Sequence, residues 1–241
     1  MTSPALVQQV AIVTGAGRGI GRAAAQALAA EGAAVVLASR TRRELADVAA
    51  AIRDSGGRAL AIPADVASAD SVDALVEQTV AELGRVDLLV TAAGVASFGP
   101  LAGTKPSDWE AMLAVNLRGA MLCCRAVLPP MLRQRRGTII NIGSIAARRP
   151  IAGCAVYAAT KAGLTAFSQV LAEEVRGEGI RVGVVVPGAV DTSLWDTVPN
   201  GPDRGRMLRV EDVARAVVLM AVLPPHAALE EITLLPAGGI L

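Results

Sequence analysis

Aromatic and histidine residues are scarce in this chain of 241 residues. It holds two Trp, one Tyr, two Phe and a single histidine, His226. Proteins that bind nucleic acid by stacking its bases use aromatic rings, and a net charge of +1 supplies no broad basic field. The composition therefore argues against a nucleic-acid-binding module. It also means that Ala, Val, Leu and Ile must build the core.

The chain is equally poor in metal-ligand and disulfide patterns. Its three cysteines, Cys123, Cys124 and Cys154, form no C-x-x-C pair, and only one histidine is available to join them. A structural zinc site takes about four such ligands, so no metal site is expected. An odd number of cysteines, two of them adjacent, does not fit a disulfide framework either. We expect reduced and mostly buried thiols in a cytoplasmic protein.

Long apolar runs are also lacking. No stretch of about 18 apolar residues is free of charges or Gly and Pro breaks, so no transmembrane span is expected. The first residues do not show the basic segment, apolar segment and cleavage site of a secretory signal. We therefore expect a cytoplasmic protein with no membrane partner.

What the chain does contain is a regular alternation of two patterns. Longer segments rich in Ala, Leu, Glu and Arg, with apolar residues spaced near 3.6, separate short apolar runs that read as strands. Such alternation predicts a parallel sheet covered on both faces, which is a single doubly wound Rossmann-type α/β domain over residues 1–241. The sheet is expected to have about seven strands, at 10–13, 34–38, 59–62, 88–91, 138–142, 181–186 and 232–235.

One segment, residues 191–209, departs from this alternation. It contains Pro199, Asn200, Gly201, Pro202 and Gly205 and shows little periodicity. Long loops in compact domains often act as lids or binding loops, so we predict a substrate loop at 191–209. The alternative is a surface connection without a function.

A glycine-rich sequence, Thr14–Gly21, directly follows the first predicted strand. Gly15, Gly19 and Gly21 open the helix that is expected to begin near Ile20. Glycine permits a tight turn and lets backbone amides approach a pyrophosphate at the positive end of the helix. The context of strand, turn and helix predicts nucleotide binding, against the alternative of an idle turn.

Tyr157 and Lys161 are spaced four residues apart, which places them on one face of a helix. An isolated phenol has a pKa of about 10, and a neighbouring ammonium group lowers this pKa toward neutrality. The pair is therefore a candidate acid/base. Ser144 follows the fifth predicted strand, at the edge of a parallel sheet where ligands bind, and its hydroxyl is placed to hold a substrate oxygen.

Taken in order along the chain, these motifs resemble those of the short-chain dehydrogenase/reductase family. The resemblance covers essentially the whole length and uses six features in the family's order. They are Thr14–Gly21, Asp65-Val66, Asn116, Ser144, the pair Tyr157/Lys161, and Pro187-Gly188-Ala189-Val190-Asp191-Thr192. The resemblance implies an enzyme that transfers a hydride between a nicotinamide cofactor and a small-molecule carbonyl or secondary alcohol.

The resemblance also implies roles for four catalytic residues. Tyr157 exchanges a proton with the substrate oxygen, and Lys161 lowers the pKa of this tyrosine and binds the nicotinamide ribose. Ser144 orients the substrate oxygen, and Asn116 holds a water that connects Lys161 to solvent. For Asn116 there is an alternative, in which the amide is satisfied within a helix bend.

A larger set of positions is expected, by the same resemblance, to contact the cofactor. Asp65 is expected to accept from the adenine amine, with a helix cap as its alternative, and Thr192 either fixes the carboxamide or caps a turn. The set comprises Gly15, Gly17, Arg18, Gly19, Ile20, Gly21, Ser39, Arg40, Asp65, Val66, Ala93, Gly94, Tyr157, Lys161, Pro187, Gly188, Val190 and Thr192.

One stretch departs from the family's pattern. Where the family usually has Asn-Asn-Ala-Gly after the fourth strand, this chain has Thr91-Ala92-Ala93-Gly94. Gly94 keeps the close approach of the backbone to the cofactor, but both amide side chains are missing. This puts in doubt some hydrogen bonds beneath the cofactor, for which only the Thr91 hydroxyl remains.

The end of the second predicted strand indicates which dinucleotide is used. NAD sites place a carboxylate there to accept from the ribose 2′-hydroxyl, whereas NADP sites place a cation near the 2′-phosphate. This strand ends Leu37-Ala38-Ser39-Arg40, with no carboxylate, and Arg18 adds a second guanidinium. Arginine suits phosphate recognition, so NADP(H) is the expected cofactor.

The substrate remains open between several readings. A general carbonyl reductase and a 3-oxoacyl-thioester reductase of fatty-acid or polyketide type fit about equally well. A regulatory protein that binds NADP(H) without turnover is the alternative of another class. Apolar residues, among them Phe98 and Trp195, are expected to border the substrate. The resemblance also implies a homo-oligomer, a dimer or tetramer formed through the helices that carry Asn116 and Tyr157.

Overall fold

Seven strands and seven α-helices alternate along the chain, in a computed structural model that describes residues 5–196, 198 and 201–240. The strands are β1 (Val10–Thr14), β2 (Ala34–Ser39), β3 (Arg58–Pro63), β4 (Leu88–Thr91), β5 (Gly137–Ile142), β6 (Ile180–Pro187) and β7 (Glu231–Leu234). The helices are α1 (Gly19–Ala30), α2 (Arg42–Asp54), α3 (Ala69–Leu83), α4 (Pro106–Met112), α5 (Ala120–Gln134), α6 (Ala155–Val175) and α7 (Val210–Ala221).

All neighbouring strands of the sheet pair in parallel, in the order β3-β2-β1-β4-β5-β6-β7. The chain therefore winds outward from β1 to β3, returns to the centre and winds outward again from β4. This confirms the doubly wound fold and the seven predicted strands, whose ends differ from the prediction by one residue at most. Helix α1 begins at Gly19, one residue before the predicted start.

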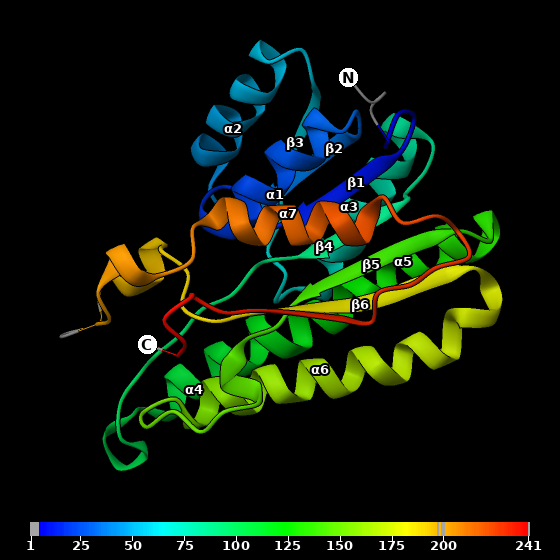
Figure 1. Cartoon of the computed structure of the whole chain (residues 1–241). Coiled ribbons are helices and arrows are strands. Elements are labelled where there is room, and N and C mark those ends of the chain that lie inside the picture. Colours follow the sequence, from blue (N-terminus) through cyan, green and yellow to red (C-terminus); the bar gives the residue numbers. More distant parts are fainter. Residues whose placement is uncertain (1–4, 197, 199–200, 241) are drawn as a thin grey trace.

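Helices cover both faces of the sheet (Figure 1). Helices α1, α2 and α7 pack on one face, and α3, α5 and α6 pack on the other. The fully buried strand β1 serves both layers, because Ala11 and Val13 point to the first face while Val10 and Ile12 point to the second. Its continuous apolar sequence is what burial on two faces requires.

The longest helical stretch, Pro106–Gln134, comprises α4, a π-helical segment η2 (Leu113–Gly119) and α5. By length and composition alone it could cross a membrane, a test that core helices of soluble proteins also pass. Here Cys124, Val127 and Met131 are buried in the core under the sheet. The burial predicted for the thiols is confirmed, and it raises the pKa of Cys123 to about 12.

The connections at the carboxyl ends of the strands gather on the left of Figure 1. Among them is the segment 191–209, which contains two short 3-10 turns, η5 (Ser193–Trp195) and η6 (Arg204–Arg206). Arg204 pairs with Asp191 at 3.2 Å and with Asp196 at 2.5 Å, and so ties the two turns together. Pro199 and Asn200, which the sequence placed in this loop, lie outside the described residues.

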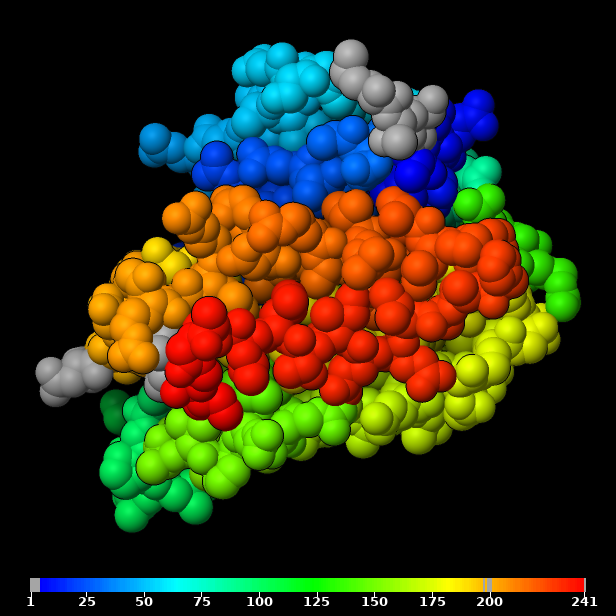
Figure 2. Space-filling model, viewed as in Figure 1, coloured from blue at the N-terminus to red at the C-terminus, as the bar shows by residue number. Residues whose placement is uncertain are grey.

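The C-terminal part of the chain borders this segment. Arg206 lies against Gly238, and Figure 2 shows the last residues (red) beside the loop and α7 (orange). Strand β7 forms one edge of the sheet and pairs only with β6 in the described part of the chain. It lies at the surface between α7 and α6 in this view.

A buried carboxylate joins the amino-terminal ends of three strands, on the side of the sheet away from the carboxyl-end connections. Asp87, whose side chain is 1% exposed, accepts from the Val10 amide at 2.9 Å and from the Arg85 guanidinium at 2.6 and 2.7 Å. Its backbone also bonds to Val10 and Thr138. The residue thus joins the starts of β1, β4 and β5.

We predict that Asp87→Ala lowers the free energy of unfolding by about 3 kcal/mol, because the change leaves a buried amide and a guanidinium without their acceptor. Urea unfolding at fixed protein concentration measures the effect. Asp73→Ala is the matched control, since it breaks an exposed pair with Arg125 that contributes less than about 1 kcal/mol. Equal losses in the two variants would contradict the prediction.

Candidate active site

Helix α6 carries the acid/base pair on the face that meets the sheet. The Lys161 ammonium lies 5.9 Å from the centre of the Tyr157 ring. It is buried and donates to the Ile142 carbonyl at the end of β5, at 2.8 Å. The four-residue spacing therefore places Tyr157 and Lys161 side by side on α6, as predicted, and the carbonyl of Ile142 holds the lysine in place.

Burial disfavours the charged form of both side chains and shifts their pKa values in opposite directions. It lowers the pKa of Lys161 to about 8. It raises the pKa of Tyr157, although the Ser144 side chain opposes the shift. The net shift is opposite to the predicted lowering, and the effect of Lys161 itself on the pKa of Tyr157 stays a prediction. The phenol is kept protonated because desolvation outweighs the nearby polar groups.

Asn116 lies in the middle of η2, where the helix widens by a π turn. Its amide exchanges two hydrogen bonds of 2.8 Å with the backbone of Val95, accepting from the N–H and donating to the C=O. It also donates to Thr160 on α6 at 3.3 Å. Asn116 therefore links the connection after β4 to the helix of Tyr157, and its amide is satisfied across elements instead of within its own helix.

The Asn116 oxygen also faces the predicted cofactor stretch after β4. A side chain at Gly94 would begin 3.5 Å from this oxygen and 3.9 Å from the Lys161 ammonium. Ser144 ends the connection from β5 and caps η3 (Ile145–Ala147), its hydroxyl accepting from the Ala146 amide at 3.1 Å. The four predicted catalytic residues thus lie around the ends of β4 and β5.

The glycine-rich turn faces this group across the sheet. Gly15 has a φ of +66°, and a Cβ there would lie 2.7 Å from the Ala93 amide, so no other residue fits. Gly19, with a φ of +54°, starts α1, and a Cβ there would lie 3.4 Å from the methyl group of Thr192. Gly21 packs tightly on Gly15 in the same way, and Ile20 packs into the core. This geometry suits a pyrophosphate at the start of α1.

The end of β2 supplies the predicted ribose end of the cofactor pocket. The Ser39 hydroxyl is buried and has no hydrogen-bond partner among the residues that the structure describes. It faces the backbone of Gly17. The exposed Arg18 and Arg40 are the next residues in the sequence after Gly17 and Ser39. A buried hydroxyl without a partner, beside a backbone with no Cβ, fits a ligand that supplies the missing hydrogen bond. The residues present therefore fit a dinucleotide.

Sequence reasoning missed Glu44, which reaches the same place from α2. Its carboxylate oxygen lies 2.5 Å from the position that a Cβ on Gly17 would take. The sequence analysis assigned this residue no role. Its spacing from Arg40 gave no indication that it turns toward the glycine-rich turn.

Asp65 and Val66 follow β3. The Asp65 carboxylate accepts from the Ala67 amide at 3.0 Å, whereas Ser68 is the residue that caps α3. The helix-cap alternative for Asp65 is therefore wrong, and its contact with adenine stays a prediction. Val66 is buried, and it contacts the backbone of η2 at Gly119.

The stretch Pro187–Thr192 leaves β6 toward the site. Pro187 and Val190 are buried, and the Gly188 amide donates to the Leu234 carbonyl at 2.7 Å. The Thr192 hydroxyl caps η5 by accepting from Leu194 at 3.4 Å, so the capping alternative for this residue is observed. Its methyl group faces Gly19 in the glycine-rich turn. The predicted contact of Thr192 with the cofactor is compatible with this cap and stays a prediction.

Thr91, the departure from the family's pattern, has a partner deep in the core. Its hydroxyl donates to the Asn141 oxygen at 2.6 Å, and the Asn141 amide donates to Ser168 on α6 at 2.8 Å. The three buried side chains join β4, β5 and α6. The Thr91 hydroxyl thus connects β4, through Asn141, to α6. The family usually has an amide side chain at this position.

Two aromatic side chains cover Tyr157. The Phe98 ring meets the Tyr157 ring edge-on, with 5.8 Å between centroids, and it stacks on Trp195 at 5.6 Å. We call Trp195, Phe98 and Tyr157 the aromatic column. The Trp195 indole also donates to the Val190 carbonyl at 2.9 Å. Phe98 therefore lies against the phenol ring with Trp195 behind it, and the predicted contact of both residues with a substrate stays a prediction.

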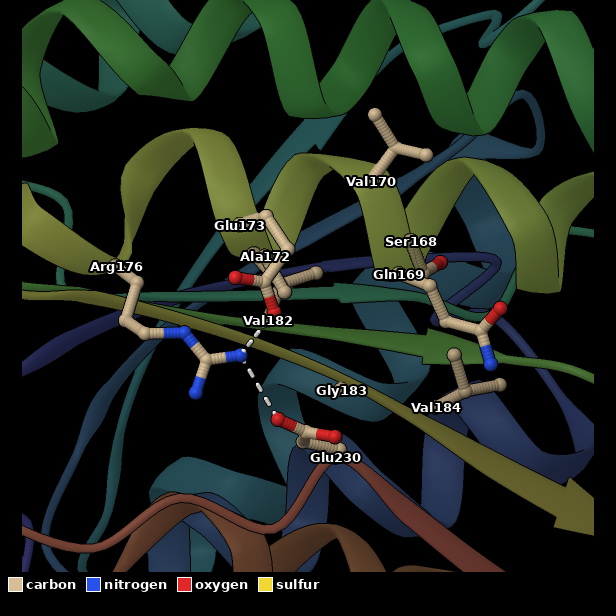
Figure 3. A pocket seen from close by; sticks show the side chains of 10 residues that line it. All are labelled: Ser168, Gln169, Val170, Ala172, Glu173, Arg176, Val182, Gly183, Val184 and Glu230. Atoms are coloured by element: carbon tan, nitrogen blue, oxygen red, sulfur yellow. Dashed lines mark hydrogen bonds and ion pairs between the residues drawn. The ribbon is translucent and has the colours of Figure 1, made fainter.

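A separate cavity of about 380 Å³ lies between α6 and the strands β6 and β7 (Figure 3). At one end Arg176 pairs with Glu173 and Glu230, as the dashed lines show. Its described lining includes none of the predicted site residues. The residues that the sequence predicts to be catalytic lie instead at the carboxyl ends of β4 and β5.

Comparison with known proteins agrees with this geometry. Residues 9–202 match the family model of the short chain dehydrogenases. A 3-oxoacyl-[acyl-carrier-protein] reductase of Synechocystis sp. is 39% identical over 98% of both chains. A metagenomic short-chain oxidoreductase solved with NADP superposes with a TM-score of 0.86, at 38% identity over 97% of this chain and 99% of the other.

A second solved structure extends the likeness. An alcohol dehydrogenase from Thermococcus sibiricus, complexed with 5-hydroxy-NADP, superposes with a TM-score of 0.88 at 30% identity, over 95% of this chain and 97% of that one. The family match, the full-length relatives and the parallel sheet with its glycine-rich turn all lead to one conclusion. The chain belongs to the short-chain dehydrogenase/reductase family of oxidoreductases.

Proposed function

We propose that this protein is an NADP(H)-dependent oxidoreductase that interconverts a small-molecule carbonyl with a secondary alcohol. The observation that carries the proposal is the meeting of Tyr157, Lys161, Ser144 and Asn116 at the ends of β4 and β5, opposite the glycine-rich turn. The likeness to structures solved with NADP and with 5-hydroxy-NADP supports the choice of cofactor.

Four regions of the chain would hold the dinucleotide. The turn at 15–21 takes the pyrophosphate, Ser39 with Arg18 and Arg40 takes the ribose 2′-phosphate, and Asp65 takes the adenine. The residues Ala93, Gly94, Val190 and Thr192 border the nicotinamide end, together with Lys161. When bound, the cofactor supplies the hydride for reduction or accepts it in oxidation.

The chain's own residues supply the proton and the alignment. Tyr157, whose pKa is raised by burial, is protonated at neutral pH and donates its proton to the carbonyl oxygen in reduction. Ser144 holds that oxygen, and Lys161 holds the tyrosine and the ribose in register. In oxidation the same side chain, as phenolate, accepts the proton of the alcohol.

A second candidate function is reduction of a 3-oxoacyl thioester. It is favoured by one observation, the 39% identity to the Synechocystis 3-oxoacyl-[acyl-carrier-protein] reductase over nearly the whole chain. A regulatory protein that binds NADP(H) without turnover is less well supported. Such a protein has no need of a buried lysine beside a tyrosine that could act as an acid.

We also propose that residues 191–209 form a substrate loop and that the enzyme is a cytoplasmic homodimer or homotetramer. The loop borders the site through Thr192 and Trp195, which face Gly19 and Phe98. Exposed apolar residues on the outer face of the helices, Leu113 and Val170, favour burial against a second copy.

The test of the main proposal is NADPH oxidation over a panel of ketones and one 3-oxoacyl thioester. We expect Tyr157→Phe to lower kcat about a thousandfold, because it removes the acid, while NADPH still binds. Undiminished turnover by the variant would refute the assigned acid. Tight NADPH binding by the native protein without turnover of any substrate would favour the regulatory alternative.

The lowered pKa of Lys161 predicts how stability changes with pH. Between about 8 and 10.5 the Lys161 side chain is protonated in the unfolded chain but mostly neutral in the folded protein, so its own contribution to the free energy of unfolding rises with pH in this window. We expect the native protein to gain about 2 kcal/mol relative to Lys161→Met between pH 7 and pH 9.5. Urea unfolding at each pH measures it.

Lys105→Met is the control for this experiment. Lys105 is the only other lysine of the chain and is exposed, so its removal should leave the slope of stability against pH unchanged. A native protein and a Lys161→Met variant that keep a constant difference over the window would show that the buried ammonium is not disfavoured.

The aromatic column predicts a preference for bulky apolar substrates. We expect Trp195→Ala to raise KM for a phenyl ketone about tenfold, because Phe98 loses its stacked neighbour, and to leave KM for a small aliphatic ketone nearly unchanged. Trp195→Phe keeps a ring and should restore the preference. The same loss for both ketones would mean that Trp195 supports the fold and does not select the substrate.

A further inference from the structure

The carboxylate of Glu44 lies inside the predicted ribose end of the cofactor pocket. A Cβ on Gly17 would stand 2.5 Å from the Glu44 oxygen and 3.2 Å from the Ser39 hydroxyl. The two side chains therefore converge on one place at the backbone of Gly17. That hydroxyl is the buried group without a partner in the described part of the chain.

The position of Glu44 is not explained by its helix. Glu44 is the third residue of α2, where a glutamate often accepts from the amide of the capping residue. Neither this bond nor any ion pair of Glu44 is found among the described residues, and the cap, Thr41, makes no side-chain bond either. The carboxylate is directed at the glycine-rich turn without a structural partner there.

Four arginines flank, in the sequence, the residues that converge at Gly17. Arg40 follows Ser39, Arg18 follows Gly17, and both are exposed and free of ion pairs within the described residues. Arg42 and Arg43 add two more guanidinium groups in the first turn of α2. One carboxylate thus stands among groups that attract a phosphate, at a position where it would repel one.

We propose that Glu44 sets the balance between NADP(H) and NAD(H), an inference that rests on the proposed dinucleotide cofactor. Its carboxylate accepts a hydrogen bond from the 2′-hydroxyl of NAD(H) and repels the 2′-phosphate of NADP(H). Arg18 and Arg40 act in the opposite sense. The pocket therefore binds both dinucleotides, with a smaller preference for NADP(H) than its arginines alone would give.

The test is calorimetric titration of the full-length protein with NADP⁺ and with NAD⁺, which requires no turnover. We expect Glu44→Gln to tighten NADP⁺ binding about tenfold, because one negative charge is removed beside the phosphate, and to weaken NAD⁺ binding a few-fold. Adenosine 2′,5′-bisphosphate and 5′-AMP, which lack the nicotinamide half, should show the same change in their ratio.

Asp54→Asn is the matched control. It removes one negative charge from the exposed far end of the same helix and should leave the ratio of the two affinities unchanged. Glu44→Ala is the second variant, and it should shift the ratio in the same direction as Glu44→Gln.

Two outcomes would overturn the inference, and they are distinguishable. If both dinucleotides bind and neither Glu44 variant changes their ratio more than Asp54→Asn does, the carboxylate plays no part in selection. The proposed function then stands. If the native protein binds neither dinucleotide, both the inference and the proposed cofactor are wrong.

Discussion

Parallel pairing of all seven strands is the constraint on which the rest of this molecule depends. Because every strand runs in the same direction, each one delivers its last residue to the same edge of the sheet. The glycine-rich turn after β1, Ser39 after β2, Gly94 after β4 and Ser144 after β5 meet there for this reason. The return of the chain from β3 to β4 opens the space between them. At the opposite, amino-terminal ends of the strands, Asp87 joins β1, β4 and β5.

Much of this arrangement could be predicted from the sequence, because its causes are local. Alternating strand and helix patterns predicted the sheet, and the spacing of Tyr157 and Lys161 predicted a shared helix face. The direction of the pKa shift of Tyr157 could not be predicted in the same way. It depends on burial, to which Phe98 and Trp195 contribute from distant parts of the chain. Glu44 was missed for a related reason, since a periodic pattern tells which face a residue occupies but not where a long side chain ends.

Thr91 illustrates how a departure from a familiar pattern is absorbed. A hydroxyl is shorter than an amide and offers a single donor, yet it finds the Asn141 oxygen at 2.6 Å. The Asn141 amide in turn donates a hydrogen bond to the Ser168 hydroxyl on α6. Helix α6, which carries Tyr157 and Lys161, is thereby attached to β4 and β5 by buried polar groups that all have partners, which favours one arrangement of α6 over slightly rotated ones.

The aromatic column has a consequence for how the site responds to its ligands. Trp195 belongs to the segment after β6, Phe98 to the connection after β4, and Tyr157 to α6, so three independently connected parts of the chain share one stack of rings. Separating the rings admits water to the phenol and makes it more acidic. The packing of the segment 191–209 and the exposure of the Tyr157 phenol to water are therefore linked through one set of ring contacts.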